Sequence, residues 1–173
     1  MDVLILRLLH VVAGAFWVGA VFTNVLFLQP TAMALGPDAG KFQYHLTRHR
    51  RFPAVILASA ATTVLAGIVL LWMTTDGLAT GLLFAPSRIG FTIGGIAAIL
   101  TFALGSLYVF PRTQRVVRLM EAAMADGRPP GAEERAQLSR IRGELLWAGW
   151  ATVAGLAVAV VTMATARHWS LLI

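Results

Sequence analysis

The sequence predicts an all-α integral membrane protein, folded as an antiparallel four-helix bundle in a single domain, residues 1–173. Two observations predict this class. Hydrophobic residues make up 58% of the chain and charged residues only 13%, whereas an ordinary globular domain has roughly 25% charged residues. The apolar residues are also gathered into four stretches of about 20 residues, the length at which an α-helix crosses the hydrocarbon core of a bilayer.

Polar segments with turn-forming residues separate the four predicted spans, which cover about residues 3–28, 52–73, 87–110 and 145–166. The first span is expected to end at Gln29-Pro30. In the long connection 111–142, residues 112–125 lack helix breakers and predict that the third helix continues beyond the membrane. Asp126–Gly131 predicts a turn because it combines Gly and Pro. The segment beginning at Ala132 predicts a helix that runs directly into the fourth span.

Basic residues are distributed unevenly between the two sides of the predicted bundle. Eleven of the fourteen Lys and Arg residues lie in the segments that join the first span to the second and the third to the fourth. Because positive charge is retained on the cytoplasmic side, both chain ends are predicted to lie outside the cytoplasm of a bacterial inner membrane. The basic residues flank apolar spans, which argues against nucleic-acid binding. The absence of cysteine excludes disulfides, iron–sulfur clusters and thiolate metal sites within the chain.

Small residues follow one side of the third and fourth spans at helical spacing. They are Gly90, Gly94, Ala97, Thr101 and Gly105 on the third, and Ala151, Gly155, Ala159 and Thr162 or Met163 on the fourth. Such stripes allow the backbones of membrane helices to approach closely. We therefore expect these two helices to pack tightly against neighbours.

His10 is the histidine that lies within an apolar span, and at heptad spacing it shares a seam with Arg7, Gly14, Trp17 and Asn24. Ionisable groups at this depth usually face a bundle interior and mark a functional site. Two interpretations follow. In the first, His10 forms a hydrogen bond to a neighbouring helix or extends to interfacial water, and in the second its imidazole ligates a metal ion or a haem iron. In the second case Gly14 leaves room for a flat macrocycle, and Trp17 can pack on it.

Other residues could complete a site around His10. Met163 lies at a similar predicted depth and is a candidate second axial ligand, and the alternative is a five-coordinate site with His10 alone. A methionine at such a position is more often simply part of the core. Arg7 and Arg88 lie near the outer ends of their helices and could neutralise haem propionates. Alternatively, both extend to the membrane interface, or Arg88 pairs with Asp76.

The remaining histidines lie outside the predicted hydrocarbon core. His45 and His49 are four residues apart on the cytoplasmic side, so they could bind a metal ion together. The alternative is a basic surface beside anionic lipid headgroups. His168 follows the fourth span, on the same side of the membrane as His10.

The segment Leu8-Leu-His10-Val-Val-Ala-Gly14-Ala-Phe-Trp17-Val-Gly19 resembles the first helix of small bacterial membrane proteins of the copper-resistance D type. It is also similar to the first helix of J-type protoporphyrinogen oxidases and of the membrane part of some urate oxidases. Arg50-Arg51-Phe52, leading into Thr62–Gly67, resembles the second helix of the copper-resistance D group. The resemblance implies a membrane bundle that holds haem b through His10. The lysine that J-type oxidases carry on their third helix is absent here, and Arg88 is the nearest cation.

The first functional hypothesis is an inner-membrane haem b-binding redox protein with His10 as axial ligand. Its partners would be the lipid bilayer, a quinone or another membrane redox protein, and further copies of the chain in a homo-oligomer; whether it is an oxidoreductase stays open. The second is a copper transport or resistance protein that uses His10 with His168, or His45 with His49. The third is a non-catalytic assembly subunit in which His10 only satisfies a hydrogen bond.

Overall fold

The computed structural model describes residues 2–35, 39–86, 88–125 and 131–171, and within these ranges every regular element is helical. Four helical stretches are long and apolar enough to cross a membrane, with mean hydropathy between 1.8 and 2.4. They are Asp2–Ala34, Phe52–Thr74, Ile89–Ala122 and Ala132–Trp169. The predicted all-helical class is confirmed, as is the number of apolar helices of membrane-spanning length in the described part of the chain.

The first stretch contains α1 (Asp2–Thr23), a π-helical turn η1 (Asn24–Leu28) and α2 (Gln29–Ala34). The next segment forms α3 (Ala39–Tyr44), a second π-helical turn η3 (His45–His49) and α4 (Phe52–Thr74). A short α5 (Thr80–Leu83) precedes α6 (Ile89–Ala103), a third π-helical turn η4 (Leu104–Val109) and α7 (Phe110–Ala125). The chain closes with α8 (Ala132–Thr165) and a 3-10 helix η5 (Ala166–Leu171).

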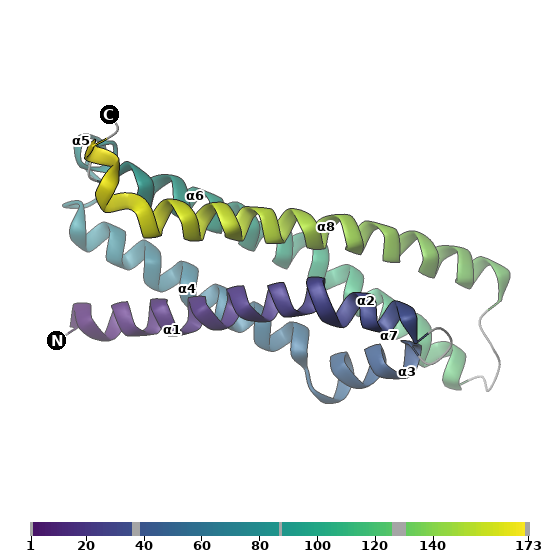
Figure 1. Cartoon of the computed structure of the whole chain (residues 1–173). Helices are drawn as coiled ribbons and strands as arrows, with labels where there is room; N and C mark the ends of the chain where they lie inside the picture. The colour runs from purple at the N-terminus through teal and green to yellow at the C-terminus, as the bar shows by residue number, and fades with distance from the viewer. Residues whose placement is uncertain (1, 36–38, 87, 126–130, 172–173) are drawn as a thin grey trace.

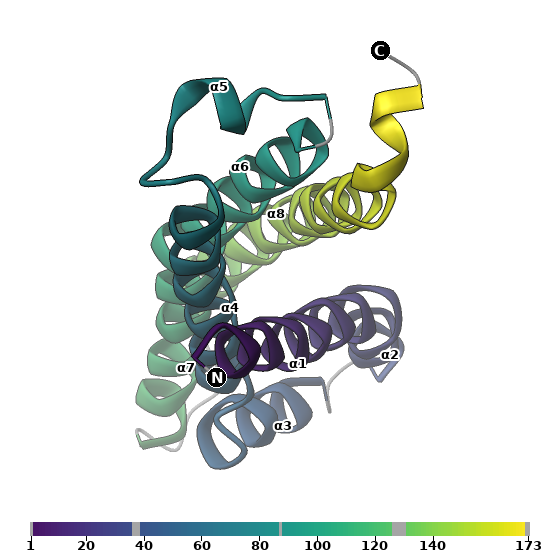
Figure 2. The ribbon, with the colours of Figure 1, turned by 90° about the vertical axis from the view of Figure 1, so that its left-hand side faces the viewer.

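The long helices associate as two closely packed pairs, α1 with α4 and α6 with α8. Figure 1 shows the four helices running along one common direction, with both chain ends at the same end of the molecule. Viewed from that end, α1 lies beside α4 and α6 beside α8 (Figure 2). Buried Trp17, Val21, Val25, Ala60, Val64 and Leu156 form the core between the pairs. This arrangement leaves most of the other apolar side chains on the outer surface, where lipid would solvate them.

The small-residue stripes pack α6 against α8, as the sequence predicts. A Cβ atom on Gly90 would lie 2.7 Å from the carbonyl oxygen of Thr162, and one on Gly94 would lie 3.0 Å from that of Ala159. Further along the pair, Gly155 faces the side chain of Thr101. Gly105 differs, because nothing lies within 4 Å of the position its Cβ would take. The stripe therefore makes close contact along α6 and ends where η4 begins.

Prolines do not end the first and third long helices, contrary to the helix end expected at Gln29-Pro30. Pro30 and Pro111 each lie two residues after the end of a π-helical turn, and the residue before each proline donates its N–H to the carbonyl five positions back. A proline ring inside an α-helix clashes with the carbonyl four residues before it. Those carbonyls, of Leu26 and Leu107, lie within the widened turns, so the helices continue.

The connections between helices agree with the other expectations from sequence. The third helix continues as α7 to Ala125, and α8 begins at Ala132 and runs without a break through the fourth span. Residues 126–130 of the predicted turn Asp126–Gly131 lie outside the described residues. At the other end of the molecule, α4 is followed by Asp76, Gly77 and Leu78, all with positive φ, which reverse the chain toward α6.

Candidate functional site

His10 is half-buried on α1 and faces α4. Its Nδ1 atom lies 2.8 Å from the carbonyl oxygen of Thr63. Because a carbonyl can only accept a hydrogen bond, this contact requires the proton on Nδ1. A neutral imidazole in that tautomer keeps its lone pair on Nε2, the atom available to a metal.

Two glycines make this contact between α1 and α4 sterically feasible. A Cβ atom on Gly67 would lie 2.8 Å from Cε1 of His10, closer than non-bonded carbon atoms approach. Gly14, one turn from His10, lies against the methyl group of Thr63, which a Cβ atom would approach to 3.2 Å. Gly67 was not among the site residues predicted from the sequence, although it lies in the segment that resembles the second helix of the copper-resistance D group. In its present position the His10 ring therefore requires a residue without a side chain at position 67.

The predicted seam of α1 faces inward from His10 onward. Trp17 is 4% exposed and belongs to the core, and Asn24 is half-buried. Arg7 lies at the other end of the seam and is exposed. The seam therefore has three parts. Arg7 is exposed, His10 contacts α4, and the part from Trp17 to Asn24 lines the cavity described below.

Arg88 does not pair with Asp76 as one interpretation expected. Its Nη1 atom donates a hydrogen bond of 2.6 Å to the carbonyl oxygen of Thr74, the last residue of α4. A cation at this position satisfies an unpaired carbonyl and interacts favourably with the C-terminal end of the helix dipole. Arg88 thus joins the start of α6 to the end of α4.

Met163 contacts α6 rather than the helices around His10. Its Cγ atom would lie 2.6 Å from a Cβ atom on Gly94. His10 makes its polar contact with α4, so the two predicted axial ligands are engaged by different neighbouring helices.

His45 and His49, in the segment between the first two long helices, form a ring stack. The centroids of His45 and His49 are 5.0 Å apart with an interplanar angle of 29°, and Tyr44 contacts His49 edge-on at 5.8 Å. His45, His49 and His168 are all exposed. Among the described residues, no group of three or more His, Asp or Glu side chains could hold a metal ion together.

A cavity of about 500 Å³ lies in the half of the molecule away from the chain ends, where α2, α3 and α7 are found (Figure 1). Trp17, Asn24, Gln29, Gln43, Gly105 and Thr152 are among its lining residues, and His10 is not. Sequence reasoning missed this cavity because its walls come from helices far apart in the chain. The local signal was the pair of prolines inside apolar helices, at Pro30 and Pro111.

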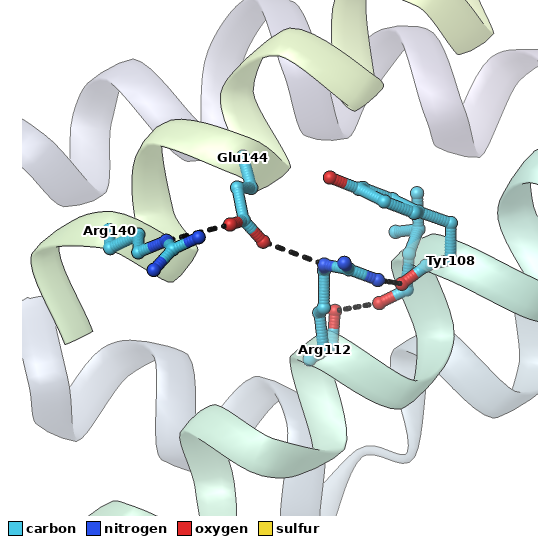
Figure 3. A network of polar contacts seen from close by, with 6 residues as sticks. Tyr108, Arg112, Arg140 and Glu144 are labelled. Carbon is cyan, nitrogen blue, oxygen red and sulfur yellow. Dashed lines mark hydrogen bonds and ion pairs between the residues drawn. The ribbon is translucent and has the colours of Figure 1, made fainter. Parts of the chain in front are cut away.

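Beside this cavity, an ion-pair network joins the start of α7 to α8. Arg112 Nε lies 2.7 Å from one carboxylate oxygen of Glu144, and Arg140 Nε lies 3.3 Å from the other (Figure 3). The Arg112 guanidinium also stacks 3.4 Å above the ring of Tyr108. These contacts hold the start of α7 against α8.

Comparison with known proteins finds no matching family model, no similar curated protein and no similar solved structure. The functional assignment therefore rests on the residues of this chain.

Proposed function

We propose that this protein is a haem b-binding redox protein of a bacterial inner membrane, with His10 as an axial ligand. The observation that supports it is the 2.8 Å contact between His10 Nδ1 and the carbonyl oxygen of Thr63. Histidines that bind metals almost always donate their other ring N–H to a carbonyl, a carboxylate or water. That bond orients the ring, fixes the tautomer and raises the basicity of Nε2. The resemblance of the first two helices to the copper-resistance D type also supports the proposal.

The donor atoms of this chain fit one axial position. His10 offers Nε2, whereas Met163 packs on Gly94 of α6 and contacts a different helix pair. The proposal is therefore a haem held by His10 on one side. Bound haem would supply reversible one-electron transfer. The roles of the chain would be to orient the imidazole through Thr63 and to accommodate its ring against α4 through Gly67.

Two arginines on the outer side would pair with the haem propionates. Arg7 is exposed and lies three residues before His10 on α1. Arg88 donates one of its five N–H groups to the carbonyl oxygen of Thr74, so other N–H groups remain for a carboxylate. Both would act through charge-assisted hydrogen bonds, which are stronger than neutral ones.

The proposed membrane topology is an antiparallel four-helix bundle with both chain ends outside the cytoplasm. The distribution of Lys and Arg supports this orientation, because eleven of the fourteen lie toward the other side. The proposed haem would then lie in the outer half of the bilayer, at the depth of His10.

Optical spectra of the purified protein, after expression with ample haem, test the proposal. We expect Soret and α bands in the wild type, their loss in His10→Ala, and their return when imidazole is added to that variant. His168→Ala removes an exposed histidine on the same side and should leave the bands unchanged. A wild type without these bands, or a His10→Ala variant that retains them, would falsify the proposal.

A non-catalytic assembly role is the second candidate, because the same hydrogen bond satisfies His10 without any ligand. His10→Gln keeps a donor near Thr63 but replaces the ring nitrogen ligand. Unchanged complex formation and unchanged activity of the assembled complex in this variant would favour the assembly role.

Copper handling is the third candidate and has less support. The exposed His45 and His49 rings are stacked, and the described residues provide no third histidine or carboxylate beside them. Metal analysis of the wild type and of a His45/His49 double alanine variant tests it. Equal, near-zero copper in both proteins would eliminate this candidate.

A further inference from the structure

A small polar pocket lies where α4 begins, between that end of the helix and α7. Its volume of about 210 Å³ is below the range of roughly 300–1,000 Å³ found for pockets that hold drug-sized ligands, so it fits a small group rather than a whole organic molecule. The lining residues are Thr47 and Arg48 of η3, Arg51 and Ala54 at the start of α4, and Gln114 and Val117 of α7.

The polar side chains of this pocket all carry hydrogen-bond donors, and three of them have no partner. Thr47 is 9% exposed, and its hydroxyl remains accessible but forms no hydrogen bond within the described part of the chain. The side chains of Arg51 and Gln114 likewise have no hydrogen-bond or ionic partner among the described residues. None of the lining residues is acidic. The missing partner is therefore a group with several acceptor atoms.

The pocket also carries positive charge. Glu121 lies 3.1 Å from Nε of Arg48, and this ion pair leaves the terminal N–H groups of the guanidinium for another acceptor. Arg51 precedes the N-terminal end of α4, which no side chain caps and whose dipole favours an anion. Its φ of 51° is a conformation that favours glycine or asparagine, so the turn itself does not account for an arginine at this position.

A tetrahedral oxyanion matches these donors better than a planar one. The donors come from η3, the start of α4 and α7, so they approach the pocket from three separate segments. A phosphate group has several acceptor oxygens, and a guanidinium pairs with two of them at once. The composition of the pocket therefore indicates a phosphate group.

The position of the pocket indicates where this phosphate comes from. Phe52, the first residue of the apolar stretch Phe52–Thr74, directly follows Arg51. The charged groups therefore lie at the level of the lipid headgroups when α4 crosses a bilayer. Val55 follows the lining residue Ala54, is 46% exposed and provides an apolar surface for an acyl chain. An ammonium group, as in phosphatidylcholine, would find no acidic residue in the lining.

We propose that this pocket binds the phosphate of an anionic phospholipid such as phosphatidylglycerol. Arg51 pairs with two phosphate oxygens, and Thr47 and Gln114 donate hydrogen bonds to the others. The acyl chains lie along the outer surface of α4. A free phosphate ion would satisfy the same donors but would gain nothing from Val55, so the lipid is the favoured source.

This lipid site goes beyond the haem proposal and is independent of it, because none of the proposed haem-binding residues lines the pocket. Failure of the optical test would leave the lipid site standing, and the converse also holds.

Arg51→Gln is the variant that tests the site, and Arg50→Gln is its matched control. The two arginines are adjacent and exposed, and each substitution removes one positive charge, but Arg50 does not line the pocket. Thr47→Val and Gln114→Met remove neutral donors from two other segments while keeping the size of each side chain. The test therefore does not depend on the folding of a single variant.

Native mass spectrometry of the purified protein in a non-ionic detergent, with phosphatidylglycerol or phosphatidylcholine of the same chain length, measures the binding. We expect a one-to-one complex of the wild type with phosphatidylglycerol and about tenfold weaker binding of phosphatidylcholine. Arg51→Gln should bind phosphatidylglycerol about tenfold more weakly, the effect of a lost charge-assisted hydrogen bond, whereas Arg50→Gln should bind it as the wild type does. Thr47→Val and Gln114→Met should each weaken it by roughly three- to tenfold, the effect of one neutral hydrogen bond. Circular dichroism and gel filtration establish that the variants fold.

Four outcomes would overturn the proposal. One is equal binding of phosphatidylglycerol and phosphatidylcholine by the wild type. Another is an equal loss of binding in folded Arg51→Gln and Arg50→Gln, which would indicate a diffuse basic surface. The third is unchanged binding in both Thr47→Val and Gln114→Met. The last is displacement of the lipid by millimolar inorganic phosphate at constant ionic strength, which would indicate a site for a soluble anion.

Discussion

His10 Nδ1 and the carbonyl oxygen of Thr63 are 2.8 Å apart and link α1 to α4. The acceptor belongs to the backbone, so no substitution at residue 63 that preserves the helix removes it. Control over this contact lies instead with Gly67, on whose surface the imidazole rests. The position of His10, a predicted functional residue, thus depends on Gly67, which has no side chain.

Gly67→Ala should displace His10 and weaken its hydrogen bond to Thr63. The new methyl group would lie 2.8 Å from Cε1 and 3.0 Å from Nδ1. The ring must therefore move away from the methyl group and lose part of its hydrogen bond to Thr63, which lowers the free energy of unfolding by about 1–3 kcal/mol. Denaturant titration in detergent, followed by circular dichroism, measures the change.

Gly19→Ala is the control for that measurement. Nothing lies within 4 Å of the new methyl group, and replacing a helical glycine by alanine stabilises by roughly 0.5–1 kcal/mol. Equal stability of the two variants would show that Gly67 and His10 are not in contact.

Gly94→Ala should destabilise the α6–α8 pair, whereas Gly95→Ala should not. A methyl group on Gly94 would lie 2.6 Å from Met163 Cγ and 3.0 Å from the carbonyl oxygen of Ala159. Backbone atoms cannot move aside, so we expect a loss of about 1–3 kcal/mol. Gly95 is the next residue and has no atom within 4 Å of its Cβ position. The unfolding midpoints of the two variants, measured in the same detergent, should move in opposite directions, and a shift of both in one direction contradicts the packing.

The four long helices could be predicted from the sequence, because the length of an apolar stretch and the spacing of small residues are local properties. It also identified His10 and offered the hydrogen bond to a neighbouring helix as one of two interpretations. It could not supply the partner, because the contact joins α1 to α4 through a backbone carbonyl that has no sequence signature. Gly67 was overlooked for a related reason: a single glycine in an apolar helix carries no indication of what rests on it.

The cavity could not be predicted from its prolines. At Pro30 the sequence predicts the end of a helix, and beyond Pro111 it predicts a helix that continues, and neither prediction indicates a cavity. At Pro30 and Pro111 the helix continues through a π-helical turn, and residues of both turns line the cavity. Proline inside an apolar helix is therefore compatible with two local structures, and only packing against the other helices decides between them.

Arg112→Gln should lower the free energy of unfolding more than Arg140→Gln, although both arginines bind Glu144. The Arg112 side chain is 32% exposed, lies 2.7 Å from the carboxylate and also stacks on Tyr108. The Arg140 side chain is 83% exposed, and its ion pair is longer at 3.3 Å. Exposed pairs contribute little because water and salt screen them.

Denaturant titrations of both arginine variants at low and high salt test this ranking. We expect salt to reduce the effect of Arg140→Gln in particular. A larger effect of Arg140→Gln than of Arg112→Gln would contradict the role assigned to the network.

Single-cysteine labelling should show Ser139 on the cytoplasmic side and Ala79 on the opposite side. The chain contains no cysteine, so Ser139→Cys and Ala79→Cys each create a unique thiol without a background variant. Both residues are exposed, Ser139 on the extension of α8 and Ala79 between α4 and α5. In intact spheroplasts, a membrane-impermeant maleimide should label Ala79→Cys, and Ser139→Cys should react only after lysis. The reverse pattern would invert the orientation drawn from the basic residues and would place His10 in the cytoplasmic half of the bilayer.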